Sequence, residues 1–166
     1  MSGVGSGPIV ATTLVEGRAD APTLLLQEPL SFWGGLDAAS GRIIDRRHPQ
    51  RGSPVSNRIL VMSAGRGSSS GSSVLAEAIR LGTGPAGIVM LSRDAIVTVG
   101  AMVASELYRK ACPVVLVRSD DWERITSAAK PFNRRRVGPR RNSCAGTSRV
   151  SDTVTAQHKF KPPACA

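Results

Sequence analysis

The sequence has no long hydrophobic run and few of the residues that bind metals. Its longest largely apolar stretches, 96–104 and 113–117, are far shorter than the roughly 20 residues that a membrane-spanning helix needs. Residues 1–7 do not combine a basic start with an apolar run, so we expect a flexible N-terminus, no secretory signal and a cytoplasmic protein. The chain has two histidines and three widely spaced cysteines, with no Cys-x-x-Cys motif. We therefore expect neither a disulfide framework nor a zinc or iron–sulfur site within this chain.

The 166 residues, 41% of them hydrophobic, are enough for one packed domain followed by a tail. The net charge of +10 is concentrated at the end: residues 131–166 hold eight Lys/Arg and one acid, whereas residues 1–130 hold fourteen and eleven. Because residues 131–166 show no apolar periodicity, we expect a folded domain over 8–130 and a basic, mostly unfolded tail. A nucleic-acid-binding arm is the functional alternative for the tail, but Phe132 and Phe160 are its only aromatic residues, which does not favour it.

The order of the expected elements favours an α/β fold. Short strand-like runs at 9–15, 23–26 and 42–45 make the first half β-rich. The second half alternates between buried strands and helices: strands at 58–62, 86–91 and 113–117, and helices at 74–81, 97–108 and 120–129. This alternation predicts a small parallel sheet with right-handed crossover helices, and we expect the β-rich half to pack beside it.

A Gly/Ser-rich loop at 63–73 lies directly between an expected strand and an expected helix. Glycines let a backbone turn sharply and approach a ligand closely. The start of the helix presents N–H groups and the positive end of the helix dipole. A hydroxyl held at that point can donate to an anion, or lose its proton more easily than in water.

Other interpretations of this loop remain open. Simple capping of the helix by Ser72 or Ser73 is one. A P-loop is excluded because no lysine lies between Gly65 and Ser73. The glycine spacing is a loose variant of a dinucleotide-binding motif, for which Asp94 would be the acidic ribose ligand.

Five segments of the sequence together resemble a known family. They are residues 28–37 (Glu-Pro-Leu-Ser-Phe-Trp-Gly-Gly-Leu-Asp), 41–49 (Gly-Arg-Ile-Ile-Asp-Arg-Arg-His-Pro), 65–72 (Gly-Arg-Gly-Ser-Ser-Ser-Gly-Ser), 101–108 and 113–116. In this order they are similar to the aconitase X small subunit, a swivelling β/β/α domain. The resemblance covers about residues 8–125, and the tail departs from it.

The resemblance implies a dehydratase, or hydro-lyase, whose active site is shared between two parts. The large part, a separate subunit or a fused domain, holds an iron centre that is either an iron–sulfur cluster or mononuclear iron. The small part supplies a serine base, which falls on Ser68 by resemblance. This chain would then bind no cofactor alone and would be inactive without the large subunit, with which it would form a heterodimer.

Position in the loop suggests roles for the residues around Ser68. Arg66 and the helix start would stabilise a serine alkoxide electrostatically. Arg66, Gly67, Ser69 and Ser72 are therefore the candidate substrate-binding residues, placed to hold a carboxylate or phosphate.

The resemblance also bears on the substrate, a small hydroxy acid. Arg66 and the Phe-Trp-Gly-Gly motif look more like the type that acts on cis-3-hydroxy-L-proline. The type that acts on mevalonate 5-phosphate, which remains the alternative, tends toward a lysine at position 66. For His48 we favour a hydrogen-bonded loop histidine over a substrate contact, and for Cys112 an inert buried filler.

Overall fold

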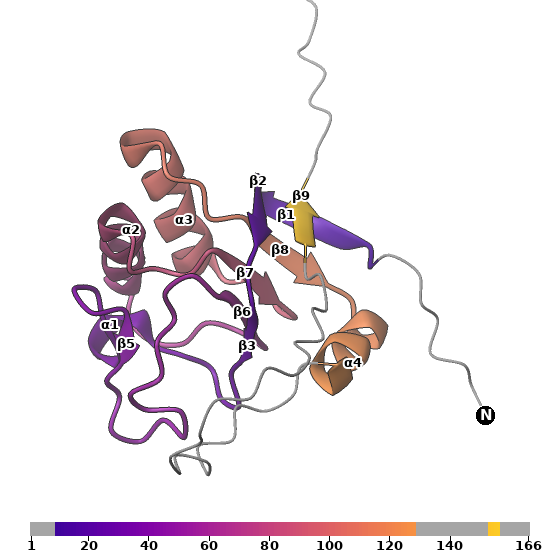
Figure 1. The fold of residues 1–166 in the computed structure, drawn as a ribbon, viewed down its shortest axis with the longest axis horizontal. Helices are drawn as coiled ribbons and strands as arrows, with labels where there is room; N and C mark the ends of the chain where they lie inside the picture. Colours follow the sequence, from indigo (N-terminus) through magenta and orange to yellow (C-terminus); the bar gives the residue numbers. More distant parts are fainter. Residues whose placement is uncertain (1–8, 129–152, 157–166) are drawn as a thin grey trace, which may run out of the picture.

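The computed structural model describes residues 9–128 and 153–156, and a five-stranded sheet lies at its centre (Figure 1). The strand order is β1-β8-β7-β6-β3. Strands β3, β6, β7 and β8 run parallel, and β1 pairs with β8 in the antiparallel direction. The bounds are β1 Ala11–Val15, β3 Thr23–Leu25, β6 Ile59–Met62, β7 Gly87–Met90 and β8 Val114–Val117. Every residue of β6 and β7 is buried, as expected for parallel strands that are covered on both faces.

Helices cover both faces of this sheet. The irregular turn α1 (Phe32–Gly35) and the helices α2 (Gly71–Leu81) and α3 (Ala95–Tyr108) lie on one face, and α4 (Ser119–Ala128) lies on the other (Figure 1). Helix α2 buries one stripe of apolar residues and ends at Gly82 in the left-handed conformation that glycine favours. In residues 9–128 and 153–156, no helix is long and apolar enough to cross a membrane.

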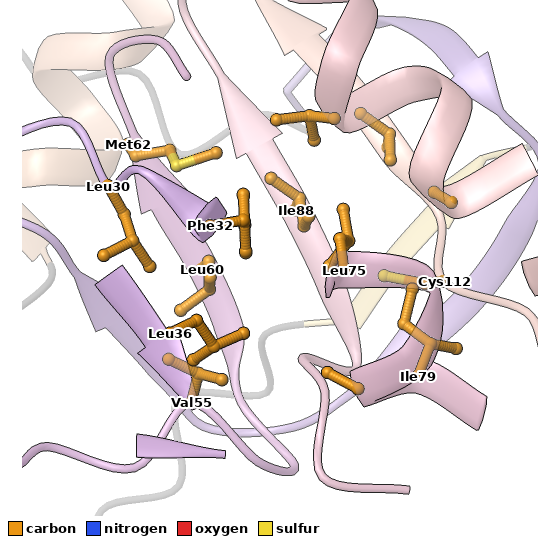
Figure 2. Packing of buried hydrophobic residues seen from close by; sticks show 14 of the residues in the cluster. Leu30, Phe32, Leu36, Val55, Leu60, Met62, Leu75, Ile79, Ile88 and Cys112 are labelled. Carbon is orange, nitrogen blue, oxygen red and sulfur yellow. The ribbon is translucent and has the colours of Figure 1, made fainter. Parts of the chain in front are cut away.

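The larger of two apolar clusters lies between the sheet and α1–α3 (Figure 2). Leu60, Met62 and Ile88 point from the sheet toward Leu75 of α2 and Phe32 of α1, and all five are almost fully buried. A side chain of this size contributes roughly 1.5–3 kcal/mol when it leaves water. The loop between β6 and α2 is therefore anchored at both ends by well-packed residues.

The expected α/β class is confirmed, with one difference in how the first half is arranged. We expected a β-rich half packed beside the parallel sheet, but β1 and β3 form the two edges of the same sheet. Their backbones complete the hydrogen bonding of β8 and β6, so a separate sheet is not needed.

Four short strands lie outside the main sheet. Strands β4 (Leu36–Asp37) and β5 (Arg42–Ile43) form a small hairpin. Strand β2 (Gly17–Asp20) pairs in the antiparallel direction with β9 (Thr153–Ala156) (Figure 1). The rest of the expected tail, and the suggested nucleic-acid-binding arm, lie outside the described residues. Strand β9 is a regular element in a region where the composition indicated none.

Cys112 lies fully buried just before β8, and burial raises the pKa of its thiol to about 12. At pH 8 such a thiol stays protonated, and the thiolate is the reactive form. We therefore expect Cys112 to resist iodoacetamide in the folded chain and to react in denaturant, as measured by peptide mass spectrometry. Equal alkylation rates in the two conditions would contradict the buried position.

Candidate functional site

The loop between β6 and α2 lies at the C-terminal ends of the parallel strands. Because β6 is flanked by β7 and β3, the segments that follow these two strands lie on either side of the loop. Leu91 and Ser92, after β7, donate backbone N–H bonds to the Ser63 carbonyl over 3.2 and 2.9 Å. Ser31, after β3, forms a parallel bridge with Arg66. Two segments that are distant from the loop in sequence therefore fix its backbone.

Two glycines allow these segments to approach closely. A Cβ built on Gly65 would overlap the carboxylate of Asp94. Gly67 has a φ of +102°, which L side chains rarely adopt, and a Cβ built there would overlap the Ser31 hydroxyl. The Ser31 hydroxyl is itself held, since it donates to the Trp33 carbonyl over 2.8 Å. The Gly-Arg-Gly sequence is thus required by packing as well as by the turn.

Ser68 is exposed in the tight turn that leads into α2. Its Oγ accepts a hydrogen bond from the Ser70 backbone N–H over 3.3 Å, and its carbonyl accepts from the Gly71 N–H over 2.9 Å. The hydroxyl therefore lies at the N-terminus of α2, where the helix dipole favours negative charge.

Ser69, Ser70 and Ser72 complete the turn. The Ser69 carbonyl accepts hydrogen bonds from the Ser72 N–H over 3.1 Å and the Ser72 Oγ over 2.8 Å. Ser69 is exposed, whereas Ser72 is half-buried. Our expectation that Ser72 or Ser73 caps the helix is wrong, because α2 begins at Gly71, and Ser70 at the cap position makes no side-chain cap bond.

Arg66 forms an ion pair with Asp45 from the segment that follows β5, with 2.9 Å between Arg66 Nη2 and Asp45 Oδ2. The pKa of the Asp45 carboxyl is held below its ordinary value, chiefly by a hydrogen bond from the Arg47 backbone N–H. Partial desolvation opposes this effect, and the positive charge of Arg66 lowers the pKa further. Asp45 therefore presents an ionised carboxylate to Arg66.

His48 is buried, and both of its ring nitrogens have partners. Its Nδ1 accepts from the Gln50 backbone N–H over 3.1 Å, and its Nε2 lies 3.1 Å from the Glu28 carbonyl. A ring whose Nδ1 accepts carries its proton on Nε2, which then donates to Glu28. His48 is the hydrogen-bonded loop histidine that the sequence favours.

Asp94 is occupied as a helix cap. Its Oδ1 accepts from the Val97 N–H over 2.9 Å at the start of α3, and the remainder of its carboxylate faces Gly65. The role of ribose ligand would compete with this cap.

A cavity of about 300 Å³ lies at the opposite, N-terminal ends of the parallel strands. It is lined by Asn57 and Lys110 among others and contains none of the candidate residues.

The described part of the chain contains no group of three or more His, Cys, Asp or Glu side chains that could hold a metal ion. The residues present at the loop are instead hydroxyls, one guanidinium and backbone groups. These groups suit the binding of an anion and the transfer of a proton.

Sequence reasoning missed two partners of the loop, Asp45 and Ser31. Both stand in segments that carry the family resemblance, but they lie 21 and 36 residues from the loop residues they contact. No spacing rule connects them to the loop, because the fold alone brings them together.

With this geometry established, the comparisons with known proteins identify the family. The family model described as "Aconitase X swivel domain" matches residues 8–131. The chain belongs to the aconitase X swivel domain family. Holo-form aconitase X from Thermococcus kodakaraensis is similar in structure, with a TM-score of 0.59 and 30% identity over 66% of this chain and 79% of that one. A UPF0107 protein solved by solution NMR has a TM-score of 0.61 and 32% identity, over 73% and 84% of the two chains.

Swivel-domain relatives by sequence include whole dehydratases and small subunits. Cis-3-hydroxy-L-proline dehydratases from Hypocrea jecorina and Pseudomonas aeruginosa are 38% and 40% identical over 70% and 76% of this chain. The chain spans only 20% and 23% of their lengths. A phosphomevalonate dehydratase small subunit from Pyrococcus furiosus is 37% identical over 70% of this chain and 81% of its own length.

Proposed function

We propose that this chain is the small, swivelling part of an aconitase X-type hydro-lyase that dehydrates a 3-hydroxy acid, with Ser68 as the base. The observation that carries the proposal is the position of Ser68: an exposed hydroxyl at the N-terminus of α2, receiving a backbone N–H, within the part of the chain that matches the family. A serine in this position can face a substrate that another part of the enzyme holds.

The proposed step is removal of the proton next to the substrate carboxylate. Ser68 Oγ, as an alkoxide, takes this proton and becomes a neutral hydroxyl, the electron pair of the C–H bond forms the new double bond, and the hydroxyl group leaves as hydroxide with the electron pair of the C–O bond. Serine is a weak base unless its alkoxide is stabilised. The Ser70 N–H, the N-terminus of α2 and the charge of Arg66 all favour the alkoxide electrostatically.

The other loop residues are proposed to bind the acid group of the substrate. Arg66 and Ser69 are exposed, and the glycine at position 67 lets the backbone approach a ligand. The Ser72 hydroxyl donates to the Ser69 carbonyl. To bind a substrate directly it would have to rotate away from this carbonyl; otherwise it would act by holding Ser69 in position.

The iron centre implied by the family does not fit the described residues of this chain, which offer no cluster of metal ligands. We therefore assign it to the large part of the enzyme, since this chain spans only about a fifth of the length of the two dehydratases. Iron bound there would supply Lewis-acid chemistry for the departing hydroxide.

Two substrates are consistent with the relatives. Cis-3-hydroxy-L-proline is the substrate we propose, supported by dehydratases of that name at 38% and 40% identity and by an arginine at position 66. Mevalonate 5-phosphate is the alternative, supported by phosphomevalonate dehydratase small subunits at 37–40% identity, such as those of Pyrococcus furiosus and Methanopyrus kandleri.

Co-expression of this chain with the large subunit of the same organism tests the proposal. We expect the purified complex to dehydrate cis-3-hydroxy-L-proline, and the isolated chain to be inactive and to bind no iron. Turnover of mevalonate 5-phosphate alone would select the alternative. A complex that is inactive on both acids would refute the hydro-lyase assignment.

A further inference from the structure

The Asp45 carboxylate is fixed by its own segment before it meets Arg66. The Ile44 and Asp45 N–H groups donate to the Gly35 carbonyl over 2.8 and 3.4 Å, and the Asp45 carbonyl accepts from the His48 N–H over 3.2 Å. Asp45 Oδ1 accepts from the Arg47 N–H over 2.9 Å. The carboxylate is therefore held on one oxygen, and the other is directed to Arg66.

The segment that carries Asp45 is also hydrogen-bonded to residues at and just after the end of β3. Buried His48 bonds to the Glu28 carbonyl, and the Gln50 side chain donates to the Leu25 carbonyl over 2.7 Å and accepts from the Gln27 N–H over 2.9 Å. These bonds join residues 45–50 to the end of β3. Asp45 thus belongs to a segment that is fixed by hydrogen bonds. A residue that orients another side chain must itself be held in place in this way.

Arg66 is fixed differently at its two ends. Its backbone forms the bridge with Ser31, while its side chain is 45% exposed and pairs with Asp45 through Nη2. Among the described residues, Asp45 is the one acidic side chain that forms an ion pair with Arg66. A guanidinium has five N–H donors, so a single bond to Asp45 orients the group and leaves other donors for a second carboxylate.

We infer that Asp45 is a positioning residue, which holds the Arg66 guanidinium so that its remaining N–H donors meet the acid group of the substrate beside Ser68. This inference rests on the proposed function of the loop. The pair links two surface segments, with side chains 45% and 21% exposed, and ion pairs that solvent can reach add little to stability. A loss on replacing Asp45 would therefore appear in substrate binding, whereas a merely structural tether would appear in the melting temperature.

The complex with the large subunit, assayed with cis-3-hydroxy-L-proline, tests this inference. We expect Asp45→Asn to raise KM about tenfold, with a smaller effect on kcat, because a mobile guanidinium must be ordered by the substrate itself. Asp45→Glu, which keeps the charge, should recover part of the loss. Arg66→Gln should raise KM similarly, and adding Asp45→Asn to it should have little further effect.

Glu77→Gln is the matched control. Glu77 forms an ion pair with Arg80 over 2.7 Å, on α2 rather than at the loop; the two arginines are equally exposed, and Glu77 is more exposed than Asp45. This variant should leave KM and kcat unchanged. A second readout needs no substrate: the heteronuclear NOE of the Arg66 Nε–H group in the labelled full chain should fall in Asp45→Asn and not in Glu77→Gln.

The outcomes separate the inference from the proposed function. If Asp45→Asn leaves KM unchanged while Ser68→Ala abolishes turnover, the inference is overturned and the proposed function stands. If the complex is inactive on both acids, the proposed function fails, and an unchanged NOE in Asp45→Asn would then also show that Asp45 does not hold Arg66.

Discussion

Replacing Ser68 with alanine is expected to lower kcat of the complex by about 10²–10⁴-fold, because a positioned base contributes a factor of that size. The two subunits should remain associated. The side chain is exposed and accepts a bond from the Ser70 N–H, so its removal leaves no cavity in the core. The measurement is kcat with cis-3-hydroxy-L-proline, together with gel filtration to verify that the two subunits remain associated.

Ser73→Ala is the control for the Ser68 prediction. Ser73 is also an exposed serine, but it lies inside α2, beyond the turn that presents Ser68. Its replacement should leave kcat near the wild-type value. A Ser68→Ala complex that retained most of its turnover would show that the base lies elsewhere, even if the hydro-lyase assignment were correct.

The sequence predicts the second half of the fold well because the information there is local. The expected helices at 74–81, 97–108 and 120–129 correspond to α2, α3 and α4, which begin one to three residues earlier. The expected strands at 58–62, 86–91 and 113–117 correspond to β6, β7 and β8. Apolar periodicity, a terminating glycine and short buried runs are properties of neighbouring residues, and these set the elements.

The first half is harder to predict because its arrangement depends on pairing between distant residues. Strand β1 joins the sheet through β8, about a hundred residues later, and β3 joins through β6. The turn α1 contains non-helical backbone at Trp33 and Gly34, so no helical spacing of apolar residues predicts it. Edge pairing is decided by which backbone groups remain without partners, and this is a property of the whole sheet.

The candidate site likewise depends partly on local sequence and partly on contacts between distant residues. The position of Ser68 between a strand and a helix follows from local sequence, and the structure places it there, exposed. The contacts that shape the loop, Arg66 with Asp45, Gly67 with Ser31 and Gly65 with Asp94, all join segments that follow different strands. They could not be predicted without the strand order.

Gly67→Ala is the second change for which we expect a large effect. Its φ of +102° is unfavourable for alanine, and the new Cβ would overlap the Ser31 hydroxyl, which is held by its bond to the Trp33 carbonyl. The loop must shift, and a displacement of about 1 Å next to the reacting atoms costs about 10²-fold in rate. We expect kcat to fall by about this factor, while a strained residue of this kind costs only about 1–3 kcal/mol of stability, measured by thermal unfolding.

Two further variants separate the backbone strain at Gly67 from the contact with Ser31. Gly82 also has a positive φ, +78°, but a Cβ built there meets nothing within 4 Å, and it lies at the far end of α2. Gly82→Ala should therefore lower the melting temperature and leave kcat unchanged. Adding Ser31→Ala to Gly67→Ala removes the overlapping hydroxyl and should restore part of the lost kcat. If the double variant is no better than Gly67→Ala, the backbone conformation at Gly67, and not its close approach to Ser31, sets the geometry of the loop.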